Sequence, residues 1–307
     1  MMKRDYLSVA DLTREEIELV FRLSLEMKEE LRRGRGKRED LSGRLFALIF
    51  EKPSLRTRVT FEGGIKQLGG DTIYLAPQDI QLGKREAVKD VARNLNRWVE
   101  GVVARVFSHD SLVEMAENMD VPVINALSDI EHPCQALADY LTIFEKSVRV
   151  DVNLVFVGDG NNVANSLMLL TAILGGNFTI ACPEGYEPAA RIMERAREIA
   201  KKTGASIEIV RSPQEAVRKA DFIYTDVWAS MGQETEAEVR NRIFRPYQVN
   251  SELLSHAPSH ALVMHCLPAR RGLEITDEVL DGERSIVLDQ AENRLHAQKG
   301  LLKFIYQ

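Results

Sequence analysis

Hydroxyl and guanidinium groups are concentrated in a short loop that follows an apolar run. In the segment FALIFEKPSLRTRVTFEGG, residues 46–64, this loop carries Ser54, Arg56 and Thr57. Pro53 disfavours helical geometry in the residue before it and Ser54 is a good N-cap, so we expect a helix to begin here. The free N–H groups of its first turn, two hydroxyls and a planar guanidinium would together suit a phosphate. The stretch alone fits a capped helix with solvated arginines equally well.

Three further polar residues lie at or after other apolar runs. Arg105 interrupts the run GVVARVF, where a guanidinium is costly unless it is paired or binds a ligand. In EHPCQ, Pro133 suits the first position of a helix, which places His132 at the helix start and Gln135 one turn on. A lone histidine at a helix start is usually structural, but ligands bind at the carboxyl ends of parallel strands. The set therefore predicts one anion-binding site at a sheet edge.

Short apolar runs alternate with helical patterns along the whole chain. This alternation predicts an α/β fold with two doubly wound parallel sheets and helices on both faces. We place the first domain at residues 1–146, the second at 147–288, and a C-terminal helix that packs back on the first domain at 289–307. The expected strands are residues 45–50, 101–107, 121–126, 152–160, 178–182, 206–210, 221–225 and 260–266.

Composition narrows the classes of function. The chain has 307 residues, of which 45% are hydrophobic, and this length suits two domains rather than one. A net charge of −6 argues against a general nucleic-acid or membrane-surface role. No run is long enough to span a membrane, the N-terminus lacks a signal-peptide core, and the three cysteines are too scattered for a disulfide framework. We therefore expect a cytoplasmic protein.

Five motifs together resemble the signature set of the aspartate/ornithine carbamoyltransferases. They are SLRTR, HPCQALADYLTI, DVWASMGQE, HCLPARRG and DQAENRLHAQK, in this order across nearly the whole chain. DVWASMGQE is typical of the members that use ornithine. The resemblance implies transfer of a carbamoyl group from carbamoyl phosphate to the side-chain amine of L-ornithine, giving citrulline and phosphate, with no metal or organic cofactor. Another amine, such as acetylornithine or putrescine, is the alternative substrate. The pattern leaves open whether the reaction serves arginine biosynthesis, the urea cycle or arginine breakdown.

By this resemblance, the first domain binds carbamoyl phosphate. Leu55 stands where many members have threonine, which removes one hydroxyl donor but leaves the backbone N–H. Gln81 matches a residue supplied to the neighbouring subunit, which implies a homotrimer, or an assembly of trimers, with shared active sites. The implied site residues are Ser54, Leu55, Arg56, Thr57, Gln81, Arg105, His132, Gln135 and, from the C-terminal helix, Arg294.

The second domain, by the same resemblance, binds L-ornithine. Its implied contacts are Asn161 or Asn162, Asp226, Ser230, Met231, Cys266 and Leu267. Asn165 stands where histidine is frequent, and we expect no change in the chemistry from it. The catalytic residues of the whole site are expected to be Arg105, His132, Asp226 and Cys266.

Other classes of protein share parts of these patterns. A nicotinamide-dependent oxidoreductase would explain the glycine-rich turn in VFVGDGNNVANSLM, but Val163 stands where G-x-G-x-x-G needs its third glycine. A zinc site could use His256, His260, His265 and Cys266. However, the last two are adjacent, so in a strand they point to opposite faces. A non-catalytic scaffold would not need so many polar groups at strand ends, because such groups lower stability unless they bind a ligand.

Overall fold

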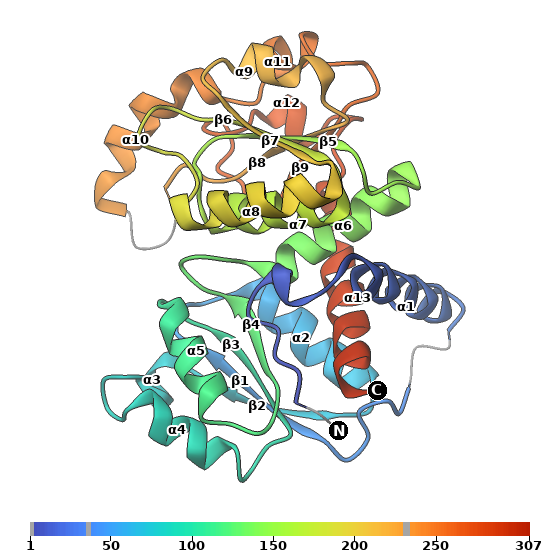
Figure 1. Ribbon diagram of the computed structural model, residues 1–307, viewed down its shortest axis with the longest axis vertical. Coiled ribbons are helices and arrows are strands. Elements are labelled where there is room, and N and C mark those ends of the chain that lie inside the picture. The colour runs from blue at the N-terminus through green and yellow to red at the C-terminus, as the bar shows by residue number, and fades with distance from the viewer. Residues whose placement is uncertain (1–2, 35–37, 230–233) are drawn as a thin grey trace. The chain divides into compact units, whose positions relative to one another are not determined.

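The chain divides into two units, whose elements are shown in Figure 1. Unit 1 contains Met1–Leu141 and Glu292–Gln307, and unit 2 contains Thr142–Ala291. The structure is a computed structural model that describes residues 3–34, 38–229 and 234–307. Each unit is built around one parallel sheet with helices on both faces, which is the arrangement that buries apolar strands most completely.

The sheet of unit 1 has the strand order β2-β1-β3-β4. Its strands are β1 (Leu45–Phe50), β2 (Asp71–Leu75), β3 (Gly101–Arg105) and β4 (Val123–Leu127). The register aligns Phe50 with Arg105 and Arg105 with Leu127, so the carboxyl ends of β1, β3 and β4 lie side by side. The loops that carry the predicted anion-binding residues therefore leave the sheet at one edge.

The helices of unit 1 position these loops. They are α1 (Arg14–Arg32), α2 (Leu55–Gln67), α3 (Pro77–Ile80), α4 (Val88–Leu95), α5 (His109–Glu117) and most of α6 (Pro133–Ser147), with a short 3-10 helix η1 (Val9–Asp11). The last helix, α13 (Val287–Tyr306), packs closely on α1. A Cβ added to Gly300 would lie 2.1 Å from Ser24 Oγ, so this contact requires glycine.

The sheet of unit 2 has the strand order β7-β6-β5-β8-β9. Its strands are β5 (Asn153–Val157), β6 (Asn177–Ala181), β7 (Ser206–Val210), β8 (Phe222–Thr225) and β9 (Leu262–His265). From β5 the strands continue to β6 and β7 on one side and to β8 and β9 on the other, and this switch in strand order makes the loops after β5 and β8 the expected ligand-binding crevice. The helices are α7 (Asn162–Leu174), α8 (Ala190–Thr203), α9 (Pro213–Ala216), η2 (Val217–Lys219), η3 (Glu234–Glu236), α10 (Ala237–Phe244), η4 (Arg245–Tyr247), α11 (Ser251–Ser255) and α12 (Asp277–Leu280).

The predicted fold class is confirmed, because both sheets are parallel and doubly wound. All eight predicted strands occur, with ends that differ by up to three residues. Strand β2 was not predicted. It lies at the edge of its sheet and is half-exposed, so DTIYL lacks the continuous apolar run of a buried strand. Among the described helices, none is long and apolar enough to cross a membrane.

Candidate active site

The predicted helix start after β1 is confirmed. Ser54 is the N-cap of α2, and its Oγ accepts a hydrogen bond from Thr57 N at 3.3 Å. Leu55 is the first helical residue, and its side chain is exposed. Arg56 is partly buried and Thr57 is buried. The first turn of α2 therefore presents backbone N–H groups, one hydroxyl and a guanidinium at the carboxyl edge of the sheet.

Arg294 of α13 joins two segments of this edge that are distant in the sequence. Its Nη2 donates to Thr57 Oγ1 at 3.0 Å, and its Nη1 donates to Gln135 Oε1. Gln135 in turn donates to Asp139 Oδ1 at 2.8 Å. Arg105, at the end of β3, is almost fully buried. The structure thus brings the predicted residues of α2, α6 and α13 into contact.

His132 lies just before α6, and its side chain is buried. Burial, reinforced by the positive charges of Arg294, Arg105 and Arg56, holds the pKa of His132 well below its ordinary value of 6.5. The imidazole is therefore neutral near pH 7, and a neutral imidazole can still donate one N–H to an oxygen. Three guanidiniums around a neutral donor form a strongly electropositive site for an anion or a developing oxyanion.

Gln81 lies apart from this group. It follows α3 in a left-handed conformation, with a φ of 42°, and its side chain is exposed. That side chain makes no hydrogen bond to another residue in the described part of the chain. Within one chain, the structure gives Gln81 no role in the anion site.

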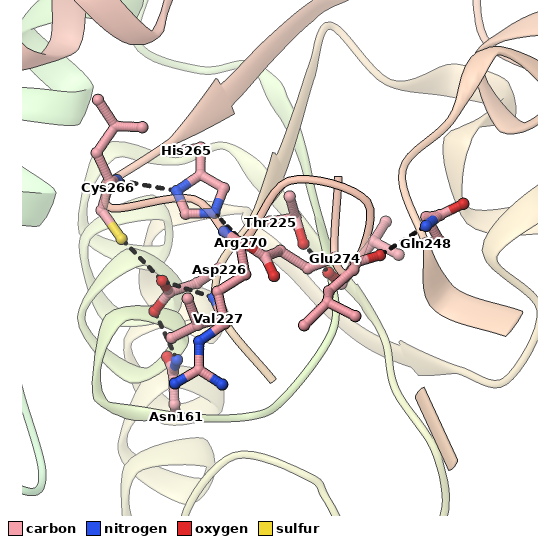
Figure 2. A network of polar contacts seen from close by, with 12 residues as sticks. Asn161, Thr225, Asp226, Val227, Gln248, His265, Cys266, Arg270 and Glu274 are labelled. Carbon is pink, nitrogen blue, oxygen red and sulfur yellow. Dashed lines mark hydrogen bonds and ion pairs between the residues drawn. The ribbon is translucent and has the colours of Figure 1, made fainter. Parts of the chain in front are cut away.

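In unit 2, three predicted residues meet at the carboxyl ends of β5, β8 and β9 (Figure 2). Asn161 caps α7, with its Oδ1 accepting from Val163 N and Ala164 N, and its Nδ2 donates to Asp226 Oδ2 at 2.7 Å. The other carboxylate oxygen, Oδ1, accepts a hydrogen bond from Cys266 Sγ at 3.0 Å. Asp226 is thus a buried carboxylate held in place by its neighbours.

The remaining predicted contacts of unit 2 are placed as follows. Asn162 is the first residue of α7 and is partly exposed, and Leu267 follows Cys266 with a φ of 57°. Ser230 and Met231 lie outside the described residues. The side chain of Asn165, buried in α7, accepts a hydrogen bond from Ala189 N at 3.2 Å, so it supports the fold of this unit.

In the part of the chain that the structure describes, the four residues of the alternative zinc site are not brought together in one cluster. Ligand atoms of Asp226, His265 and Cys266 lie within 4.8 Å of one another, the one such cluster in the described ranges. However, His265 Nδ1 accepts from Leu267 N at 2.9 Å and Nε2 lies 3.1 Å from Glu274 Oε1. Both ring nitrogens are therefore engaged, and only two ligands would remain for a metal that usually takes three or four from the protein.

The glycine-rich turn after β5 is occupied by the chain itself. A Cβ added to Gly160 would lie 2.2 Å from Pro188 N and 2.7 Å from Glu187 O. The second glycine of a dinucleotide-binding turn allows the backbone to approach a pyrophosphate. Here the close approach serves the packing of the loop after β6, which weighs against a nicotinamide cofactor.

An ion pair that was not predicted lies beside this turn. Arg240 of α10 donates through Nη1 to Asp159 Oδ2 at 3.0 Å and to the carbonyl of Trp228 at 2.9 Å. Burial raises the pKa of Asp159 from its ordinary value of 3.8 to about 6, although Arg240 lowers it. No local pattern predicted this pair, because Arg240 lies 81 residues away from Asp159 in the sequence.

We expect Asp159 to make stability depend on pH. Its raised pKa means that the folded state binds the proton more tightly than the unfolded state. Its contribution to the free energy of unfolding is therefore fully present below pH 3.8 and falls by about 3 kcal/mol as the pH rises through about 6. Urea unfolding of the wild type and Asp159→Asn at several pH values should show a difference that changes across this window. A difference that stays constant from pH 4 to pH 7 would contradict the assignment.

The sequence and the structure both match known carbamoyltransferases. Residues 4–145 match the carbamoyl-P binding domain and residues 150–305 match the Asp/Orn binding domain of the aspartate/ornithine carbamoyltransferase family. The chain therefore belongs to this family. It is 52% identical to an ornithine carbamoyltransferase of Methanopyrus kandleri, covering 97% of this chain and 96% of the relative. An anabolic ornithine carbamoyltransferase of Pyrococcus furiosus is 50% identical, covering 98% of this chain and 96% of the relative. A solved structure of ornithine carbamoyltransferase from Pyrococcus furiosus superposes with a TM-score of 0.95 at 50% identity, covering 98% of this chain and 96% of that chain.

Proposed function

We propose that this carbamoyltransferase moves the carbamoyl group of carbamoyl phosphate to the side-chain amine of L-ornithine, giving citrulline and phosphate. The observation that carries the proposal is the cluster of Arg56, Arg105 and Arg294 around the neutral imidazole of His132. A cluster of three guanidiniums and one neutral N–H donor suits a dianionic phosphate beside a polar carbonyl. The family and the relatives supply the acceptor, since both relatives are named for ornithine.

The chemistry requires positive charge and hydrogen-bond donors at two places. Attack by the neutral amine builds negative charge first on the carbonyl oxygen and then on the leaving phosphate. Arg105 and His132 are proposed to stabilise the carbonyl oxygen. Arg56 and the first turn of α2 are proposed to stabilise the phosphate, and Gln135 to hold the carbamoyl amide through the second lone pair of its Oε1. Loss of one such donor costs about 10²–10³ in rate in comparable sites. Because these groups supply the charge, the proposal needs no metal or organic cofactor.

The ornithine site is proposed at the carboxyl end of the second sheet. Asp226 is a fixed, buried carboxylate that suits the α-ammonium group. Asn161 already uses both ends of its amide, as the cap of α7 and as a donor to Asp226, so Asn162 is the better candidate for the α-carboxylate. Cys266 and Leu267 are proposed to lie beside the reacting amine.

The proposal is tested by incubating the purified chain with carbamoyl phosphate and L-ornithine and measuring both citrulline and phosphate. Equal amounts of the two products are expected. A chain that binds carbamoyl phosphate but forms no citrulline would refute the ornithine assignment.

The proposed setting is arginine biosynthesis in the cytoplasm. The relative from Pyrococcus furiosus is named as anabolic. In the described ranges, Cys134, Cys182 and Cys266 form no disulfide, as expected in a reducing compartment.

We also propose that the active enzyme is a homotrimer, or an assembly of trimers, in which Gln81 completes the site of a neighbouring subunit. Several apolar side chains of unit 1 are exposed in the single chain, among them Leu55 by 72% and Val59 by 59% on α2, and Ile73 by 47% on the edge strand. Exposed apolar side chains beside a site are typical of an interface. The exposed position of Gln81 fits a role outside its own chain.

Mixed oligomers should reveal the shared site. Gln81→Ala and Arg56→Ala chains are each expected to be inactive alone. Co-expressed with different tags, they should regain up to about one quarter of the wild-type sites, because random mixing pairs an intact Arg56 with a neighbour's intact Gln81 at that frequency. Co-expression of Arg56→Ala with Arg105→Ala is the matched control and should give no recovery, since both residues belong to the same half of the site. Mixed oligomers as inactive as the control would show that each site is built within one chain.

A further inference from the structure

A buried histidine–carboxylate pair, His265 and Glu274, lies next to Cys266 (Figure 2). His265 ends β9, and Glu274 follows in the next loop. Both side chains are completely buried, and His265 Nε2 lies 3.1 Å from Glu274 Oε1. Neither residue is among the proposed substrate contacts.

The hydrogen bonds of the His265 ring define its protonation state. Leu267 N–H donates to Nδ1 at 2.9 Å, so Nδ1 carries a lone pair. The ring proton is therefore on Nε2, which donates to Glu274 Oε1. This neutral imidazole is held from both sides, by the backbone of the turn and by the carboxylate.

Glu274 is itself fixed by the surrounding loops. Its Oε1 also accepts from Arg270 N at 2.6 Å, and its backbone carbonyl accepts from Val249 N at 2.8 Å. Gln248 Nε2 donates to the carbonyl of Leu273 at 2.7 Å. In the described part of the chain, Glu274 Oε2 has no hydrogen-bond partner. A buried carboxylate that accepts hydrogen bonds at only one of its oxygens lowers the stability of the folded chain. Packing alone therefore does not explain why a glutamate stands at this position.

The turn depends on the support that this pair gives. Leu267 has a φ of 57°, a left-handed conformation that disfavours residues other than glycine. Its N–H is satisfied by His265, and the preceding Cys266 is the residue whose Sγ contacts Asp226 at 3.0 Å. We infer that Glu274 is a positioning residue for ornithine: it orients His265, and His265 holds the turn that presents Cys266 and Leu267 to the reacting amine. This inference rests on the proposed function.

The test compares Glu274→Leu and Glu274→Gln with the wild type, by steady-state kinetics for each substrate separately. Glu274→Leu removes the acceptor for His265 and should raise the KM for ornithine by about 10-fold to 100-fold, by analogy with the cost of losing a partner that orients a metal-binding histidine. The KM for carbamoyl phosphate should stay unchanged. Glu274→Gln keeps Oε1 as an acceptor and should restore most of the affinity for ornithine.

A purely structural role would give a different result. Leu253→Ala is the structural control, because Leu253 lies in the apolar core of unit 2. It should lower the melting temperature without changing the ratio of the KM for ornithine to the KM for carbamoyl phosphate. In the wild type, the ¹⁵N spectrum of His265 should show the Nε2–H tautomer, and Glu274→Leu should alter it. If Glu274→Leu leaves the KM for ornithine unchanged, or raises both KM values equally, the positioning role is wrong.

Two variants of His265 keep the inference testable if Glu274→Leu does not fold. Asparagine places an acceptor where Nδ1 lies, so His265→Asn should keep the bond to Leu267 N–H. Glutamine places its amide where Nε2 lies, so His265→Gln should keep the hydrogen bond to Glu274. It should lose the hydrogen bond from Leu267 N–H that supports the turn. The KM for ornithine should therefore be higher in His265→Gln than in His265→Asn, and equal values would overturn the inference. If the wild type itself forms no citrulline, the proposed function fails first and the inference falls with it.

Discussion

Replacing Arg56 with alanine should abolish measurable citrulline formation and sharply weaken the binding of carbamoyl phosphate, while the chain stays folded. Arg56 lies in the first turn of α2, where its charge adds to the backbone N–H groups that face the proposed phosphate. The charge on the leaving phosphate grows as the reaction proceeds, so the loss should affect kcat as well as KM, by about 10²–10³ or more. Steady-state kinetics and calorimetric titration with carbamoyl phosphate measure the two effects.

Two variants test whether the geometry of Arg56 matters as well as its charge. Arg56→Lys should restore little activity, because lysine cannot reproduce the planar fork of donors. Arg58→Ala is the matched control two residues away. The Arg58 guanidinium packs 3.6 Å from the ring centre of Tyr74 and lies 3.5 Å from the partly exposed carboxylate of Glu62. Its loss should leave turnover within about fivefold of the wild type, since exposed ion pairs contribute little. Near-normal kinetics for either Arg56 variant would show that the phosphate does not bind at the start of α2.

The second large effect concerns the choice of amine. The kcat/KM for L-ornithine should exceed that for acetylornithine, putrescine and aspartate by a factor of at least about 100. Sites that hydrogen-bond a polar substrate group can discriminate by about 10⁴–10⁵ against an analogue that lacks it. Acetylornithine lacks the α-ammonium group that would pair with Asp226, and putrescine lacks the α-carboxylate. Aspartate would bring a carboxylate to the place of the reacting amine. Each mismatch leaves a buried polar group without a partner, which costs more than a lost contact.

The four amines should be assayed at saturating carbamoyl phosphate, with release of phosphate as the common readout. Comparable turnover with acetylornithine, putrescine or aspartate would refute the ornithine assignment and leave carbamoyl transfer standing. Asp226→Asn provides the matching variant, because it removes the charge but keeps the shape. It should narrow the preference for ornithine over acetylornithine, since the site would no longer favour a cation.

Sequence patterns that act over a few residues predicted much of the fold. Ser54 caps α2 and Pro133 begins α6 because capping and proline geometry depend on the local backbone. Apolar runs predicted the buried strands for the same reason, and the half-exposed strand β2 was missed because it has no such run. The motifs also indicated the family, since their residues stand in fixed order along the chain.

Only the tertiary structure decided how these residues act on one another. Arg294 contacts Thr57 and Gln135 across 237 and 159 residues of sequence, and no local pattern specifies such a pairing. The lowered pKa of His132 is likewise a property of its burial and of guanidiniums from three separate segments.

The same distinction holds in the second unit. HCLP marked Cys266 and Leu267 as contacts, but nothing in the sequence singled out Glu274 as the acid that orients His265. Gly160 resembled part of a nucleotide-binding turn until the structure showed the chain's own backbone in that space. Sequence therefore determined which chemical groups are available and, to within a few residues, where most of the elements lie. Burial and long-range contact determined their charge, their orientation and their partners, because these depend on atoms that meet only after the chain has folded.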